Sequence, residues 1–202
     1  MKQVSQFIST LFMPLFMPAY SVALLFVYSY FRYAYGAHFY SLIVPTLLFT
    51  FVVPGVLIYV MVKIGIISDL ALPKRSDRFL PYTVTVLSFS FLIYYFYKLG
   101  MPTWFLTMIG SSIVVMILAT IITLWWKISA HMFGVAGLLG GVMAVCYFVD
   151  KSNPVTLFMI LFIIAGMVGT SRIILKRHTP AQVYAGFLLG FVMSFVGVWI
   201  GS

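Results

Sequence analysis

Two of the three histidines in this sequence, His131 and His178, lie among arginines and lysines at breaks between long apolar runs. Three such polar breaks cover residues 72–81, 126–131 and 171–182. One imidazole can attack a phosphorus atom while a second protonates the departing oxygen, and fixed cations can hold the other phosphate oxygens. These residue types therefore suit phosphoryl transfer without a metal ion. Basic loops and interfacial histidines at a membrane surface explain the same residues equally well, since such loops are common in membrane proteins.

Composition indicates a membrane protein. Of the 202 residues, 63% are hydrophobic and only 7% are charged, whereas a soluble domain carries about 25% charged residues. A water-exposed globule is therefore excluded, and the abundance of apolar side chains excludes intrinsic disorder. The net charge of +9 is distributed between apolar runs and does not form one basic face. We therefore expect a phosphate or lipid headgroup as the anionic partner, and no nucleic acid.

The scarcity of metal ligands limits the chemistry further. The three acids, Asp69, Asp77 and Asp150, are too scattered to form a carboxylate cage for Mg²⁺ or Ca²⁺. The one cysteine, Cys146, offers neither an internal disulfide nor the spacing of a cysteine metal site. The sequence therefore predicts chemistry with no metal and no cofactor.

Seven apolar runs predict an all-α, polytopic membrane bundle that forms a single integral-membrane domain over residues 1–202. A helix needs about 20 apolar residues to cross the hydrocarbon core of a bilayer. The two shortest runs are expected to extend into their flanks. The runs lie near residues 7–31, 41–62, 80–97, 103–126, 131–149, 155–171 and 180–200. Glycines four residues apart predict close helix packing at Gly137/Gly141, Gly186/Gly190 and Gly197/Gly201.

The three polar breaks are expected at the same membrane face, because two crossings separate each break from the next. Most of the basic residues fall on that N-terminal side: Lys2, Lys63, Lys74, Arg75, Arg78, Lys127, Arg172, Lys176 and Arg177. The other side holds Arg32, Lys98 and Lys151. The positive-inside rule would place the richer side in the cytoplasm, with a weaker bias if several of these cations bind phosphate.

The third break resembles the Ser-Arg-x5-His-x3-Asp signature of the type-2 phosphatidic acid phosphatases. Ser171 and Arg172 are followed after five residues by His178, and after three more by Gln182. The second break, Ile128-Ser129-Ala130-His131, is similar to the Pro-Ser-Gly-His motif of that family at two of four positions.

The first break resembles the opening Lys-x6-Arg-Pro motif of the family only loosely. Lys74 and Arg75 lie four and three residues before Arg78, and the proline is Pro81. The order and spacing of the three breaks agree with the family, and the similarity covers roughly residues 72–200.

This resemblance implies a helical membrane phosphatase with a six-helix core that works through a phosphohistidine and needs no metal. His178 would be the nucleophile. His131 would protonate the lipid alkoxide and afterwards activate water. The resemblance also implies phosphate-binding residues, namely Lys74, Arg75, Arg78, Ser129, Ser171 and Arg172.

Gln182 replaces an aspartate that orients the nucleophilic histidine in the family. An amide carbonyl can orient an imidazole but cannot stabilise its growing charge, and the analogous loss in the serine-protease triad costs about 10⁴ in rate. Residues 179–182, Thr-Pro-Ala-Gln, also predict a capping box, and the two roles are compatible. Asp77 is the alternative carboxylate, placed to reach the His178 site or to support Arg78, although a surface pair with a neighbouring cation explains it more simply.

Together these patterns predict a lipid phosphatase, a membrane hydrolase of phospholipid metabolism that cleaves a phosphomonoester or diphosphate of a lipid. A phosphotransferase of the same chemistry is the alternative enzyme, and a non-catalytic lipid-phosphate binder or carrier is the alternative outside enzymes. We expect a multi-pass protein of a cell membrane, the bacterial inner membrane. Family members typically work on the outer face, which opposes the charge bias, so both orientations stay open.

Overall fold

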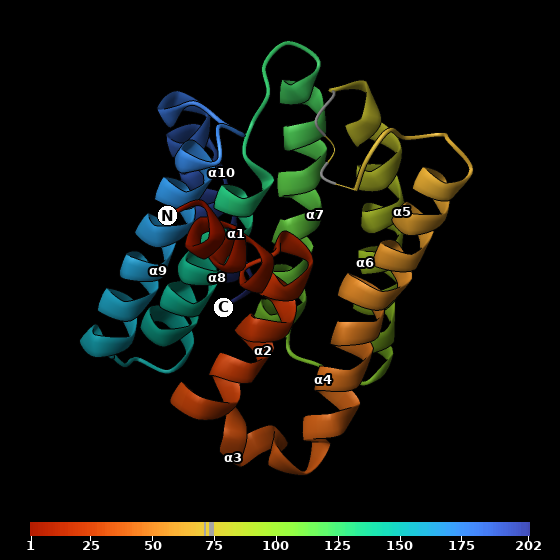
Figure 1. The fold of residues 1–202 in the computed structure, drawn as a ribbon. Helices are drawn as coiled ribbons and strands as arrows, with labels where there is room; N and C mark the ends of the chain where they lie inside the picture. Colours follow the sequence, from red (N-terminus) through yellow and green to blue (C-terminus); the bar gives the residue numbers. More distant parts are fainter. Residues whose placement is uncertain (71, 73–74) are drawn as a thin grey trace.

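The computed structural model describes residues 1–70, 72 and 75–202 (Figure 1). Within these residues the chain is helical and contains no strand, which confirms the predicted all-α class. The α-helices are α1 (Lys2–Leu11), α2 (Met17–Tyr28), α3 (Phe31–Tyr35), α4 (Phe39–Leu47), α5 (Val53–Lys63), α6 (Phe79–Lys98), α7 (Thr103–Thr123), α8 (Ala130–Ala144), α9 (Val155–Ile174) and α10 (Pro180–Gly201). Short 3₁₀ and π-helical turns join or extend them at Pro14–Phe16, Gly36–His38, Leu48–Val52, Ser76–Arg78 and Val145–Val149.

Among the described residues, seven helical stretches are long and apolar enough to cross a membrane, which confirms the predicted multi-pass bundle. The two short runs extend into their flanks as expected, because a helix rises only about 1.5 Å per residue and the hydrocarbon core is about 30 Å thick. The stretches are Lys2–Tyr28, Phe31–Lys63, Ser76–Lys98, Thr103–Thr123, Ala130–Val149, Val155–Ile174 and Pro180–Gly201.

Helices α8 and α10 pack closely against each other at the centre of the bundle. A Cβ added at Gly190 would overlap the backbone of Phe133, and one added at Gly186 would lie 2.8 Å from the carbonyl oxygen of Ser129. Only glycine allows the two backbones to approach this closely, so the predicted role of the paired glycines is confirmed here. Because Ser129 precedes α8 and residue 179 precedes α10, this contact also fixes the starts of both helices relative to each other.

The first apolar run differs from the continuous helix that its length predicts. Helix α1 ends at Leu11, and Met13 is extended with φ −64° and ψ 137°. The cause is Pro14, which lacks an N–H and disfavours helical backbone at the residue before it. As a result α1 packs along α9 while α2 packs on α8 (Figure 1).

The three polar breaks lie at one end of the bundle, at the top of Figure 1, as the sequence predicts. They precede α6, α8 and α10 and meet through direct contacts. The guanidinium of Arg78 donates to the carbonyl of Ile128 at 2.8 Å, and the backbone N–H of Ser129 donates to the carbonyl of Gln182 at 3.4 Å. Segments distant in sequence are therefore joined at this end.

Candidate functional site

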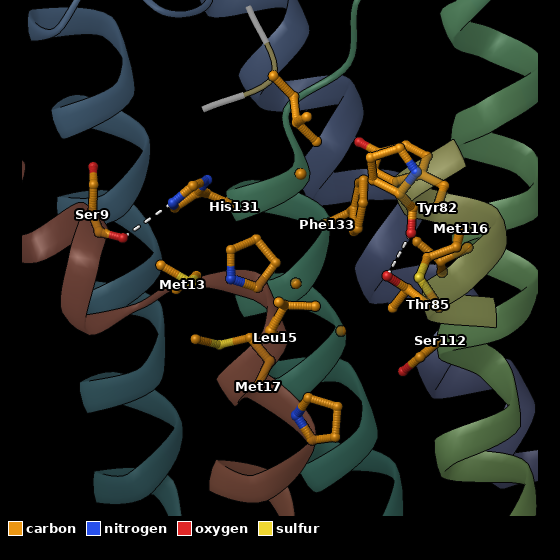
Figure 2. Close-up of a pocket in the computed structure, with 18 of the residues that line it drawn as sticks. Ser9, Met13, Leu15, Met17, Tyr82, Thr85, Ser112, Met116, His131 and Phe133 are labelled. Atoms are coloured by element: carbon orange, nitrogen blue, oxygen red, sulfur yellow. Dashed lines mark hydrogen bonds between the residues drawn. The ribbon is translucent and has the colours of Figure 1, made fainter. Parts of the chain in front are cut away.

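A cavity of about 830 Å³ opens within the bundle beneath these breaks. Basic residues and histidines line one part of it: Arg78, His131, Arg172, Lys176, Arg177 and His178. The remainder is mostly apolar and continues between α2, α6, α7 and α8, past Met17, Phe89 and Met108. Figure 2 shows His131 above Met13, Leu15 and Met17, with Tyr82, Thr85 and Met116 on the opposite wall. A cavity of this size and character suits a ligand with one anionic end and a long apolar part.

His178 lies in the turn between α9 and α10 and is only 8% exposed. Its Nδ1 is 3.0 Å from Oε1 of Gln182, and the backbone N–H of Thr179 donates to the same oxygen at 3.3 Å. A backbone N–H can only donate, so the atom that receives it is the amide carbonyl oxygen. Nδ1 must then carry the proton that it shares with Oε1. The lone pair of His178 is therefore on Nε2, which is the state a nucleophilic imidazole requires.

Gln182 has both of the roles that the sequence allows. It completes a capping box with Thr179 at the start of α10, its backbone N–H donating to the threonine hydroxyl at 3.4 Å. Its side-chain carbonyl at the same time orients His178. One residue thus couples the geometry of the helix start to the orientation of the imidazole.

The environment keeps His178 neutral. Its pKa is lowered from 6.5 to about 3, chiefly by burial; the charges of Arg78, Arg172 and Lys127 act in the same direction, and the hydrogen bond with Gln182 opposes them. Burial and the neighbouring arginines also lower the pKa of Lys127. Cations that disfavour one another in this way attract an anion, since an anion relieves their repulsion.

Two of the arginines contribute differently. Arg78 is buried, and its Nε and one terminal nitrogen donate to the carbonyls of Leu72 and Ile128 at 3.3 and 2.8 Å. A guanidinium has five N–H donors, so Arg78 joins two polar breaks and still lines the cavity. Arg172, in the last turn of α9, has a buried Nε with no hydrogen-bond partner in the described part of the chain. Arg172 also lines the cavity, so its guanidinium can donate to a bound oxyanion.

His131 is the second residue of α8, where the residue preceding the helix, Ser129, is fully buried. Nε2 of His131 lies 3.0 Å from the backbone carbonyl oxygen of Ser9, on α1 (Figure 2). Sequence reasoning missed this contact, because 122 residues separate the two positions. Ser129, a predicted phosphate-binding residue, carries a buried hydroxyl without a hydrogen-bond partner among the described residues and is not among the residues that line the cavity.

Other predicted site residues lie away from the cavity wall. Arg75 donates to the carbonyls of Leu124 and Trp125, at 3.4 and 2.8 Å, and so ties the first break to the end of α7. Ser171 is buried in α9 and is not among the residues that line the cavity. Lys74 lies outside the described residues. The geometry therefore gives Arg75 and Ser171 no direct place at a bound phosphate.

Asp77 also lies outside the cavity wall. It accepts hydrogen bonds from the backbone N–H of Ser68, at 3.0 Å, and from the hydroxyl of the same residue. The hydroxyl of Ser76 also donates to it, at 3.2 Å. These contacts close the loop between α5 and α6, which favours a structural role for Asp77 over the predicted support of His178.

Lys176 and Arg177 line the cavity, although the sequence interpretation did not assign them to the phosphate. Their position directly before His178 was the available signal.

Comparison with protein-family models, curated proteins and solved structures gives no match for this chain. The residues of the site are therefore what indicates a function.

Proposed function

We propose that this protein is an integral-membrane lipid phosphatase that hydrolyses a phosphomonoester or diphosphate of a lipid through a phosphohistidine. The observation that carries the proposal is the setting of His178. It is neutral, it is oriented by Gln182 with its Nε2 lone pair available, and it lies among cations at the charged end of a largely apolar cavity.

The reaction follows in two steps. Nε2 of His178 attacks phosphorus, the bond to the lipid oxygen breaks, and His131 gives a proton to that oxygen. Water then attacks the phosphohistidine and gives its proton to His131, which releases phosphate and restores both histidines. Arg78 and Arg172 bind the equatorial oxygens, where negative charge is concentrated in the transition state.

The apolar part of the cavity supports a lipid as the substrate. A phosphate or diphosphate at the cations would place the attached chain between α2, α6, α7 and α8, beside side chains such as Met17 and Phe89. Burial of a hydrocarbon chain there is worth about 25 cal/mol per Å². The bacterial inner membrane is the location that we propose for this activity.

The test is release of inorganic phosphate from lipid phosphates and lipid diphosphates by the purified protein, in detergent micelles that contain EDTA. We expect turnover in EDTA and a loss of at least about 10³-fold in His178→Ala. His38 is the matched control, since it lies in the turn Gly36–His38, far from the cavity in sequence and outside its lining. Loss of activity on chelation, or full activity in His178→Ala, would contradict the mechanism.

Gln182 is neutral and cannot stabilise a positive charge on His178. This favours a second function, that of a lipid-phosphate binder or carrier. In that case lipid binding would need Arg172 and Arg78, whereas His131→Ala and His178→Ala would bind normally and no phosphate would appear. A phosphotransferase would instead give a phosphorylated acceptor in place of free phosphate. Scoring binding, phosphate release and acceptor labelling in parallel separates the three functions.

A further inference from the structure

Helix α1 forms part of the cavity wall that carries the histidines. Ser5 and Ser9 are buried, and α1 packs against α9. Gln6, Ser9 and Thr10 line the same cavity as His131. The break at Met13 and Pro14 separates α1 from α2, so that α1 packs on α9 while α2 packs on α8.

The end of α1 offers His131 an unused acceptor. The last four carbonyls of an α-helix have no partner within the helix, and Ser9 is the third residue from the end of α1. Its carbonyl oxygen lies 3.0 Å from Nε2 of His131. Because a carbonyl can only accept, Nε2 must carry a proton whether the imidazole is neutral or cationic.

We propose that the main-chain carbonyl of Ser9 is the positioning group for His131, and that Nδ1 is therefore the nitrogen that exchanges protons with the substrate. In Figure 2 the second ring nitrogen of His131 lies on the side of the ring away from Ser9. This inference rests on the proposed lipid phosphatase function. Helix α1 then orients His131 in the way that Gln182 orients His178.

The proton balance of the two steps agrees with this assignment. Once the phosphate is bound, His131 takes up a second proton from the medium and becomes an imidazolium. When the P–O bond to the lipid breaks, the Nδ1 proton passes to the lipid oxygen, and Nε2–H stays on the carbonyl of Ser9. When water attacks the phosphohistidine, its proton returns to Nδ1 as the P–N bond breaks. The bond to Ser9 is kept throughout the cycle.

The test uses the full chain with ¹⁵N-labelled histidine, because imidazole ¹⁵N shifts distinguish the two neutral tautomers without any need for turnover. We expect His131, assigned by its disappearance in His131→Gln, to carry its proton on Nε2. Ser9→Leu should produce a mixture of tautomers, since a larger side chain at this buried position forces α1 away from α9. Val4→Leu is the matched control, because it enlarges a side chain of the same helix that is exposed. Ser5→Leu displaces α1 at a second buried position.

Kinetics on the same variants give an independent measure. A displacement of about 1 Å can cost about 10²-fold in rate, so we expect kcat to fall about 10- to 100-fold in Ser9→Leu with little change in KM. Val4→Leu should stay within about twofold of the wild type. A folding control is the detergent-solubilised gel-filtration profile of each variant.

The outcomes separate this inference from the proposed function. A wild-type His131 with its proton on Nδ1 would overturn the inference, and so would unchanged tautomers and kcat in both Ser9→Leu and Ser5→Leu. If phosphate release occurs in either of those cases, the phosphatase function stands and only the role of α1 fails. If no lipid is hydrolysed but the tautomers behave as expected, the positioning of His131 stands and the phosphatase function fails.

Discussion

His178 and His131 line the same cavity but are held by different kinds of partner. Gln182, four residues after His178, orients it from the first turn of the following helix. The partner of His131 is a backbone carbonyl on α1, at the other end of the sequence. The first arrangement forms whenever α10 begins correctly. The second requires the tertiary packing of α1 on α9, so the two histidines depend on different parts of the fold.

Arg172 lies near both histidines, as Arg78 does, and we expect its loss to have the largest effect after that of the nucleophile. Because Arg172 lines the cavity and carries a fixed positive charge, we expect it to bind the phosphate in the transition state. Arg172→Ala should lower kcat/KM for phosphate release about 10²- to 10³-fold. Arg32→Ala, at a cation that contacts Tyr33 outside the cavity, is the matched control. Equal activity in the two variants would remove Arg172 from the site.

Substitutions of Gln182 test the local arrangement, in which Gln182 orients His178. Gln182→Leu removes the acceptor for His178, and we expect kcat to fall about 10- to 100-fold, within the range of general positioning effects. Gln182→Glu places a carboxylate at the same position, which should raise the pKa of His178 and increase kcat. The control is Thr179→Ala, which removes the cap hydroxyl but leaves Oε1 of Gln182 in place. A similar loss in the control would assign the effect to the helix cap.

The pH dependence of stability gives a test that needs no substrate. The pKa of His178 is lowered to about 3 in the folded protein, against about 6.5 in an unfolded chain. Above pH 6.5 both states are neutral. As the pH falls from 6.5 towards 3, the unfolded state takes up a proton that the folded state does not, so the free energy of unfolding decreases. Denaturant titrations in detergent at pH 7 and pH 5 should show a smaller decrease in His178→Asn, and an equal decrease would contradict the burial of a neutral imidazole.

Asp77→Asn should have the smallest effect on activity. Because Asp77 accepts hydrogen bonds from Ser68 outside the cavity wall, we expect unchanged turnover and a loss of stability of about 1 kcal/mol. Phosphate release and thermal unfolding of the variant measure the two quantities. Reduced turnover with unchanged stability would restore the catalytic role that the sequence allowed for this residue.

The sequence predicts well those features of the molecule that depend on local patterns of residues. Apolar runs predict the spans and paired glycines predict close helix packing, because both depend on residue type and spacing alone, but they do not predict that α8 and α10 are the partners. The capping box at Thr179 and the approach of Gln182 to His178 are also local, since both lie within one helical turn. The convergence of the three polar breaks follows from the number of crossings.

The remaining features depend on packing that no local pattern records. Nothing in the residues around His131 points to Ser9, because their contact exists only after α1 folds back along α9. The same holds for Arg75, whose guanidinium binds carbonyls at the end of α7 and does not face the cavity. Pro14 predicts that the helix breaks, but it does not predict the direction in which α1 then runs.

The methionines that line the cavity have a consequence for its selectivity. Met13, Met17, Met108 and Met116 contribute flexible, unbranched side chains to the wall, and methionine adapts its rotamers to irregular partners more readily than branched residues do. Such a wall can change shape around straight, kinked or branched chains. Discrimination between lipids would then arise at the polar end, from the number and spacing of the phosphates, while the hydrocarbon chain would be tolerated broadly.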